Sequence, residues 1–160
     1  MIGPTPPECN TPIPRPTPLP IPRPRYAAAM PKVRPVVHAL LLADQITVDQ
    51  GKWNILGVFE YLWTFEFPTT LQPFFIFCAV SSLRGPTEIQ VTIRADDPDA
   101  DDLFRASQRA SIDDPTAVYD LSFCVPRLTL PEPGAYTVAL HADGDFLLSR
   151  PFKLMQAERE

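Results

Sequence analysis

The chain has 160 residues, 21 of them proline, and a formal net charge of −5. The charge is uneven: residues 1–35 carry +4, whereas residues 36–160 carry −9. Because an acidic domain repels phosphates, we expect no binding to nucleic acid. The longest apolar runs are too short to span a bilayer and the N-terminus lacks a secretory signal pattern, so we expect a cytoplasmic protein with no membrane partner.

The first 35 residues form a basic arm that holds 12 of the prolines and shows no hydrophobic periodicity. Such a segment cannot build a core, so we predict a disordered arm at 1–35. Proline occupies every even position from Pro12 to Pro24, which favours extended polyproline II structure. SH3-type ligands need prolines three residues apart, a separation absent from this run. We therefore interpret the arm as a stiff spacer before one domain at 36–155, which a tail at 156–160 follows.

The start of the domain predicts two paired strands. Apolar and β-branched residues favour strands at Val36–Leu42 and Trp53–Phe59, with a polar connection around Asp49–Lys52. Gly57, inside the second strand, indicates a bulge or a close backbone approach. Asp44 stands where the first strand is expected to end, and we predict that it caps a turn.

The middle of the domain contains further strand patterns. The apolar run "FFIFCAVSSL" is typical of a central strand, and "TEIQVTIRA" alternates with Ile89, Val91 and Ile93 on one face. Between turn signals, "LFRASQRASI" and "AVYDLSFCV" also favour strands. Cys78 and Cys124 lie in apolar runs, so we expect buried thiols. A disulfide between the two is geometrically open, but the missing secretory signal argues against it.

The end of the domain predicts a hairpin around Asp143-Gly144, a preferred two-residue turn. Tyr136, at the start of its first strand, is expected to make a corner hydrogen bond to the backbone. The candidate inward side chains are Tyr136, Val138 and Leu140 on the first limb and Phe146, Leu148, Phe152 and Leu154 on the second. About eight short strands and no clear amphipathic helix predict an all-β chain, a single antiparallel β-sandwich of the immunoglobulin-like type.

Four segments resemble a known family: "VHALLLAD" at Val37–Asp44, "GKWNILGVF" at Gly51–Phe59, the loop at Phe67-Pro68, and the hairpin region Pro133–Phe152. The family is an uncharacterised bacterial family of small β-sandwich proteins, a domain of unknown function. The resemblance implies a compact β-sandwich and brings no catalytic residues. Its members start a few residues before the first segment, where this chain has Met30. Translation from Met30 and translation from Met1 are therefore both open.

An acidic loop, Asp96–Asp102, offers the candidate metal ligands. Closely spaced carboxylates suit Ca²⁺, and the first three ligand positions of an EF-hand loop are matched by Asp97, Asp99 and Asp101. Asp102 stands at the position where that loop needs glycine, and Gln108 at the position where it needs glutamate. We expect a solvated turn, with a weak Ca²⁺-binding module as the alternative.

The residues that hydrolases use are present but scattered. His38 and His141 lie on separate predicted strands, and no G-x-S-x-G segment or phosphate-binding glycine loop occurs. We therefore expect no catalytic residues, no cofactor and no enzymatic activity. A small hydrolase-type enzyme is kept as an alternative.

Aromatic residues give the clearest candidate for a binding surface. Tyr61, Trp63 and Phe65 alternate in sequence, so an extended strand places them on one face. Most of that face is expected to be core, but tryptophan and tyrosine dominate interface anchors wherever such a face is exposed. We therefore predict a non-catalytic protein-interaction or structural module with an unidentified protein partner.

Overall fold

The computed structural model describes residues 34–111 and 113–159, which form strands and contain no helix. The all-β class is thus confirmed, and within the described residues there is no helix that could cross a membrane. The predicted arm lies almost wholly outside the described residues. The strands are β1 (Val36–Asp49), β2 (Lys52–Val58), β3 (Tyr61–Thr64), β4 (Thr69–Leu71), β5 (Phe74–Ser81), β6 (Thr87–Ala95), β7 (Phe104–Ala110), β8 (Tyr119–Val125), β9 (Leu128–Leu130), β10 (Gly134–Ala142) and β11 (Asp145–Gln156).

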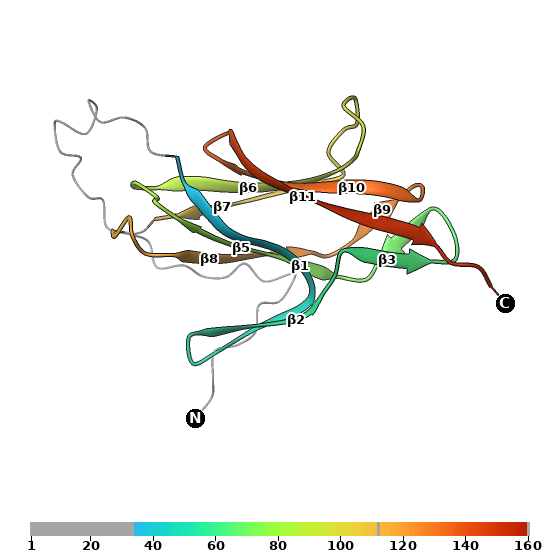
Figure 1. Ribbon diagram of the computed structural model, residues 1–160, viewed down its shortest axis with the longest axis horizontal. Helices are drawn as coiled ribbons and strands as arrows, with labels where there is room; N and C mark the ends of the chain where they lie inside the picture. Colours follow the sequence, from blue (N-terminus) through green and yellow to red (C-terminus); the bar gives the residue numbers. More distant parts are fainter. Residues whose placement is uncertain (1–33, 112, 160) are drawn as a thin grey trace.

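The strands form two main sheets, which Figure 1 shows as two layers. The first sheet has the order β2-β1-β5-β8 and is antiparallel throughout. The second sheet has the order β3-β11-β10-β6-β7, with a parallel pair between β3 and β11. Strands β4 and β9 form a separate antiparallel pair. The short strands β3, β4 and β9 are the main reason that the expected number of about eight strands was too low.

The main core lies between the two sheets and contains the predicted alternating strand. Ile89, Val91 and Ile93 of β6 are completely buried, which confirms the predicted inward face. Strand β5 lies between β1 and β8, as expected of a central strand. The other inward residues come from both sheets, among them Leu42, Ile76, Leu121, Val138, Phe152 and Leu154.

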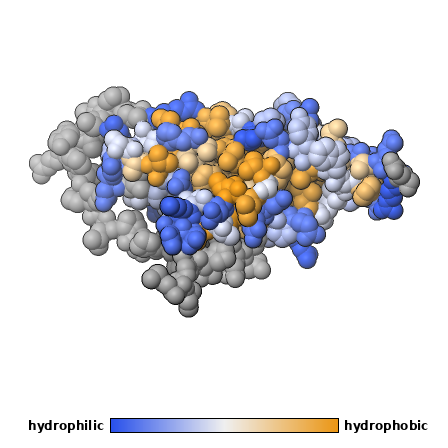
Figure 2. Space-filling model, turned by 60° about the horizontal axis from the view of Figure 1, so that its bottom comes forward, coloured by the Kyte–Doolittle hydropathy of each residue, from blue (hydrophilic) through white to orange (hydrophobic). Residues whose placement is uncertain are grey.

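The outer face of the first sheet is also apolar. Phe77 and Ala79 of β5 cluster there with Ala43 and Ile46 of β1, and the Trp53 ring packs on the Phe77 ring at 5.5 Å. Figure 2, in which the side of the first sheet comes forward, shows a hydrophobic area between hydrophilic margins. These residues are mostly buried, so this face is packed rather than open.

The predicted pairing of the first two strands is confirmed, with Asp49 opposite Lys52 at the turn. Strand β1 continues well past Leu42, so Asp44 lies in mid-strand and the prediction that it caps a turn was wrong. The predicted close approach at Gly57 is confirmed. Gly57 has φ +70°, and a Cβ atom there would lie 2.6 Å from Oδ2 of Asp44.

The predicted hairpin is confirmed as β10–β11, with Asp143 at φ +48° and Gly144 at φ +85° in its turn. Tyr136 stacks on Phe152 with ring centroids 5.6 Å apart. Its hydroxyl donates to the carbonyl of Glu132 at 2.5 Å, so the expected corner hydrogen bond is present. Burial raises the pKa of the Tyr136 phenol above its usual value, which keeps this donor protonated.

Two predicted inward residues of the hairpin are exposed. Phe146 is 48% exposed, so that prediction was wrong. Leu148 lies opposite the buried Leu140, on the predicted inward side, but is 41% exposed because it lines the open depression between β1 and β11. The register shifts between Leu140 and His141, which leaves Leu147 as an extra residue on β11. This bulge reverses the alternation near the turn, and Leu147 rather than Phe146 packs against the core.

The expectation of two buried thiols holds for one cysteine. Cys78 is completely buried and is not in a disulfide, so the Cys78–Cys124 bond is not formed. Cys124 is half-buried and disulfide-bonded, which corrects its expected state.

Candidate functional site

Four exposed large hydrophobic side chains lie on β3, directly after β3 and at the end of β11; we call them the aromatic edge. They are Tyr61 (49% exposed), Trp63 (66%), Phe65 (52%) and Met155 (42%). The Tyr61 and Trp63 rings stack with centroids 6.2 Å apart. Met155 pairs with Trp63 across the β3–β11 ladder, so it extends the same surface. The three residues predicted as a protein-binding surface are therefore together and exposed.

On one side of β3, the backbone N–H and C=O groups have no partner strand among the described residues. Tyr61 pairs with Lys153 and Trp63 with Met155, and the Lys153 N–H donates to the Glu60 carbonyl at 2.9 Å. In a parallel ladder a residue bonds to the two neighbours of its partner, so the even-numbered residues of β3 face β11. Tyr61 and Trp63 direct their N–H and C=O groups to the opposite edge. No described strand pairs with β3 on that side.

Carboxylates flank both ends of β3. Glu60 pairs with Arg150 at 2.5 Å, and Glu66 pairs with Arg159 at 3.0 Å. The Arg159 guanidinium also lies over the Phe65 ring, 5.4 Å from its centroid. Both glutamates are more than half exposed, so these pairs contribute little to stability and are accessible to a charged partner.

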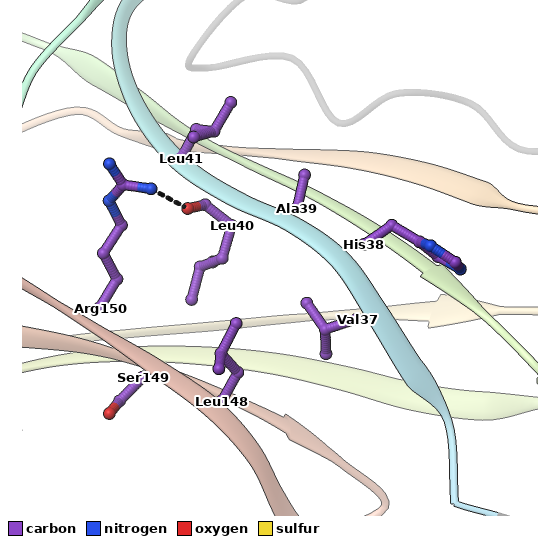
Figure 3. Close-up of a pocket in the computed structure, with 8 residues that line it drawn as sticks. All are labelled: Val37, His38, Ala39, Leu40, Leu41, Leu148, Ser149 and Arg150. Carbon is purple, nitrogen blue, oxygen red and sulfur yellow. Dashed lines mark hydrogen bonds between the residues drawn. The ribbon is translucent and has the colours of Figure 1, made fainter.

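One of the two histidines, His38, is in hydrogen-bond contact with a serine. A bulge between Val37 and Ala39 displaces His38, whose Nε2 lies 2.6 Å from Oγ of Ser81. His38 also lines a shallow depression of about 330 Å³ between β1 and β11, in which Arg150 donates to the Leu40 carbonyl (Figure 3).

This pair lacks the other parts of a hydrolase site. Ser81 is 8% exposed, and the described residues place no carboxylate in hydrogen-bond contact with His38. His141 lies on β10 of the second sheet, against Phe146, so the two histidines are not brought together.

The acidic loop is organised by its own ion pairs. Asp102 accepts hydrogen bonds from Arg94 at 2.6 Å and from Arg105 at 2.5 Å, and these guanidinium groups lower the pKa of its carboxyl. Asp97 accepts the backbone N–H of Asp99 at 3.0 Å. Across 34–111 and 113–159 no group of three or more His, Cys, Asp or Glu side chains could hold a metal ion. Ca²⁺ binding by Asp97, Asp99 and Asp101 stays an untested alternative.

Fold and site define the class of protein: an all-β domain of two main sheets whose outermost strand exposes an aromatic surface. The chain belongs to a family of unknown function, DUF6941, whose model matches residues 38–155. This agrees with the expected membership of an uncharacterised family.

One solved structure with some likeness is "Pseudomonas fluorescens alkylpurine DNA glycosylase AlkC bound to DNA containing an abasic site analog", at 13% sequence identity and a TM-score of 0.43. The match covers 76% of this chain and 30% of that one, so this chain spans about a third of its length. A likeness at this TM-score does not inform the function. Comparison with curated proteins gives no match.

Sequence reasoning missed Met155, Arg150 and the open side of β3. Met155 joins the aromatic edge because β3 pairs with β11 in parallel, far apart in sequence. Arg150 reaches the first sheet from the second because it lies opposite the buried Val138, on the face of β11 that also carries Phe152. The pairing of β3 with β11 leaves no local pattern, whereas the alternation of exposed Met155 with buried Phe152 and Leu154 in β11 was visible in the sequence.

Proposed function

We propose that the protein is a non-catalytic protein-interaction module that binds its partner through the aromatic edge. The observation that carries this proposal is the exposure of Tyr61 and Trp63 on a strand whose outer backbone groups have no described strand partner, with the exposed Phe65 directly after that strand. Aromatic anchors supply large contact area at low entropic cost, and an open strand edge supplies directional hydrogen bonds. A partner with an extended apolar segment fits both.

We also propose that the two sheets form an immunoglobulin-like sandwich. The orders β1-β5-β8 and β11-β10-β6-β7 match the A-B-E and G-F-C-C′ orders of such domains. The corner hydrogen bond of Tyr136 on β10, the counterpart of strand F, supports this assignment. In this scheme β3 is an addition beside the last strand, which places the aromatic edge outside the common fold.

The experiment is affinity capture from the native host with the full chain and with the double variant Tyr61→Ser, Trp63→Ser. We expect the captured partner to bind the double variant about 30-fold more weakly, the loss typical of two anchors. The matched control is Leu103→Ser with Val118→Ser, which removes two other exposed apolar side chains (39% and 49% exposed). Equal loss of the partner from both double variants would contradict the proposal.

The contact between His38 and Ser81 favours one second candidate, a hydrolase that uses Ser81 as nucleophile and His38 as base. A fluorophosphonate probe tests it, because the probe bonds covalently to an activated serine. We expect no labelling of Ser81, which is buried. Labelling that disappears in His38→Gln would favour the enzyme instead.

A further inference from the structure

The side of β3 that faces away from β11 lacks the features that keep another strand from pairing. Tyr61 and Trp63 direct their N–H and C=O groups to this side, and no backbone hydrogen bond to these groups is present within the described residues. The strand contains no proline, no charged residue and no bulge, which are the usual protections of an exposed edge. Such an edge is a template for a further strand.

Several other free edges of the two main sheets carry these protections. The free part of β11 contains Pro151, which has no N–H to donate. The Leu40 carbonyl on the unpaired part of β1 accepts from Arg150, and the Ser122 carbonyl on β8 accepts from Gln108. By comparison, β3 is left available for pairing.

We propose that the occupant of this edge is a second copy of the chain, whose β3 adds in antiparallel orientation about a two-fold axis. A strand that pairs in this way with its own copy forms a closed dimer, because each copy offers the same groups to the other. The inference rests on the proposed function, since it names the partner that binds the aromatic edge. The second sheets of the two copies then form one continuous sheet.

The free backbone groups of β3 determine the register. In an antiparallel pair, residues that exchange both hydrogen bonds lie directly opposite each other. When Tyr61 lies opposite Trp63 of the second copy, the reciprocal pair forms as well, and none of the free N–H and C=O groups of these residues stays unpaired. Leu62 then lies on the two-fold axis. Directly opposite residues share a face, so the stacked rings of the two copies lie side by side.

The structure disfavours the two neighbouring registers. One would place Trp63 opposite Phe59 of the second copy, but the Phe59 N–H already donates to the Leu42 carbonyl of its own chain at 3.0 Å. The other would bring Glu60 directly opposite Glu66 of the second copy, and like charges in that position destabilise a strand pair. The register with the tyrosine–tryptophan pairs avoids both conflicts.

Charge favours a second copy at this edge over one elsewhere on the domain. Residues 36–160 carry a net charge of −9, so two copies repel each other over most of their surface. At the ends of β3, in contrast, each carboxylate has an arginine: Glu60 pairs with Arg150, and Glu66 pairs with Arg159. Antiparallel pairing brings the first end of one copy beside the second end of the other. Two neutral ends therefore meet, and no excess of like charge builds up.

Sedimentation of the purified full chain over a range of protein concentrations tests the proposal. Because β3 has four residues, the interface is small and belongs to the weak, transient class. We expect the wild type to pass from monomer to dimer as the protein concentration rises. A wild type that stays monomeric over the whole range would overturn the proposal.

A matched pair of variants tests the backbone pairing. Trp63→Pro and Trp63→Ser both remove the ring, but only proline also removes the N–H that faces the second copy. This N–H has no described partner within its own chain, so its loss breaks no ladder bond to β11. We expect the proline variant to dimerise about tenfold more weakly than the serine variant. Equal dimerisation of the two variants would contradict pairing through the backbone.

Hydrogen exchange of the wild type gives a test without a substitution. The N–H groups of Leu62 and Thr64 face β11, so their exchange should not depend on protein concentration. Those of Tyr61 and Trp63 should exchange about tenfold more slowly where the protein is dimeric than where it is monomeric. Slowing of all these amides together, or of none, would count against the proposal.

Cysteine cross-linking tests the register. Leu62→Cys places two thiols opposite each other on the two-fold axis, in a pair without mutual hydrogen bonds whose Cα atoms lie about 4.5 Å apart, close enough for a disulfide. Thr64→Cys is the control, because its thiol lies opposite Glu60 of the second copy. Under mild oxidation we expect Leu62→Cys to give more covalent dimer than the wild type. Covalent dimer from the control instead would overturn this register.

Capture of a different protein from the native host by the surface variants is a separate measurement. A purified chain that stays monomeric overturns the dimer, whereas the proposed function fails when both double variants lose the captured partner equally. Failure of the inference and failure of the proposed function are therefore distinguishable.

Discussion

At the scale of single residues, Gly57 shows how a missing side chain shapes the first hairpin. Gly57 lies opposite Asp44 on the neighbouring strand, with its backbone in the left-handed region at φ +70°. A Cβ atom there would meet the Asp44 carboxylate at 2.6 Å. Glycine therefore satisfies two requirements at once, the backbone angle and the contact.

The variant Gly57→Ala is expected to lower the free energy of unfolding by about 2 kcal/mol or more, from the φ penalty plus the contact. Gly51→Ala is the matched control: Gly51 has φ +74°, but a Cβ atom there would meet nothing within 4 Å, so it should show the φ penalty alone. Urea denaturation measures both. A Gly57→Ala, Asp44→Ala double variant should recover the part of the loss that the contact causes.

The Tyr136 hydroxyl permits a second test at this scale. The variant Tyr136→Phe keeps the stacking on Phe152 but removes the donor to the Glu132 carbonyl, so we expect a loss of about 1 kcal/mol in unfolding free energy. Thermal denaturation at neutral pH measures it. No change in stability would show that water replaces the hydroxyl as the donor.

At the scale of elements, Asp102 links the two strands of the β6–β7 hairpin next to the loop that connects them. This carboxylate, 12% exposed, accepts from Arg94 of β6 and from Arg105 of β7. The pattern of five aspartates in the loop predicted a solvated turn or a Ca²⁺ site. Arg94 and Arg105 alternate with the inward residues of their strands, so the local pattern marks both as outward and gives no sign of their shared partner.

The variant Asp102→Asn should lower the unfolding free energy by about 1 kcal/mol at pH 7, since it weakens two ion pairs whose arginines are exposed to solvent. The folded-state pKa of Asp102 lies below its ordinary value, so this stabilisation is complete above about pH 4 and disappears as pH falls through the folded-state pKa. Denaturation curves of both proteins at pH 7 and pH 2 measure the difference. A difference that persists at pH 2 would assign it to something other than the charge.

At the scale of the whole molecule, a side chain of the second sheet reaches a backbone carbonyl of the first sheet on each side. Arg150 of β11 donates to the Leu40 carbonyl at 3.0 Å, and Gln108 of β7 donates to the Ser122 carbonyl at 2.6 Å. Leu40 lies in the part of β1 that does not pair with β2, and Ser122 lies on the edge strand β8. These bonds join the layers and occupy groups that another chain could otherwise pair with.

The variant Arg150→Met keeps most of the apolar stem but loses this bond and the pair with Glu60, and we expect a loss of about 1–2 kcal/mol in unfolding free energy. Arg127→Met is the matched control, because Arg127 is exposed and should change stability by less than about 0.5 kcal/mol. Urea denaturation measures both variants, and sedimentation shows whether loss of the bond promotes self-association. Equal effects of the two variants would contradict a bridging role for Arg150.

The sequence by itself determined the all-β class, the strands with strong alternation, the turn at Asp143-Gly144 and the need for glycine at Gly57. Each depends on residues close together in the chain, where side-chain period and backbone preference act directly. The tertiary structure decided which faces are exposed. The bulge on β11 placed Phe146 outside, and the parallel pairing of β3 left Tyr61 and Trp63 on an open edge. Those outcomes depend on contacts between segments far apart in sequence, and no local pattern carries that information.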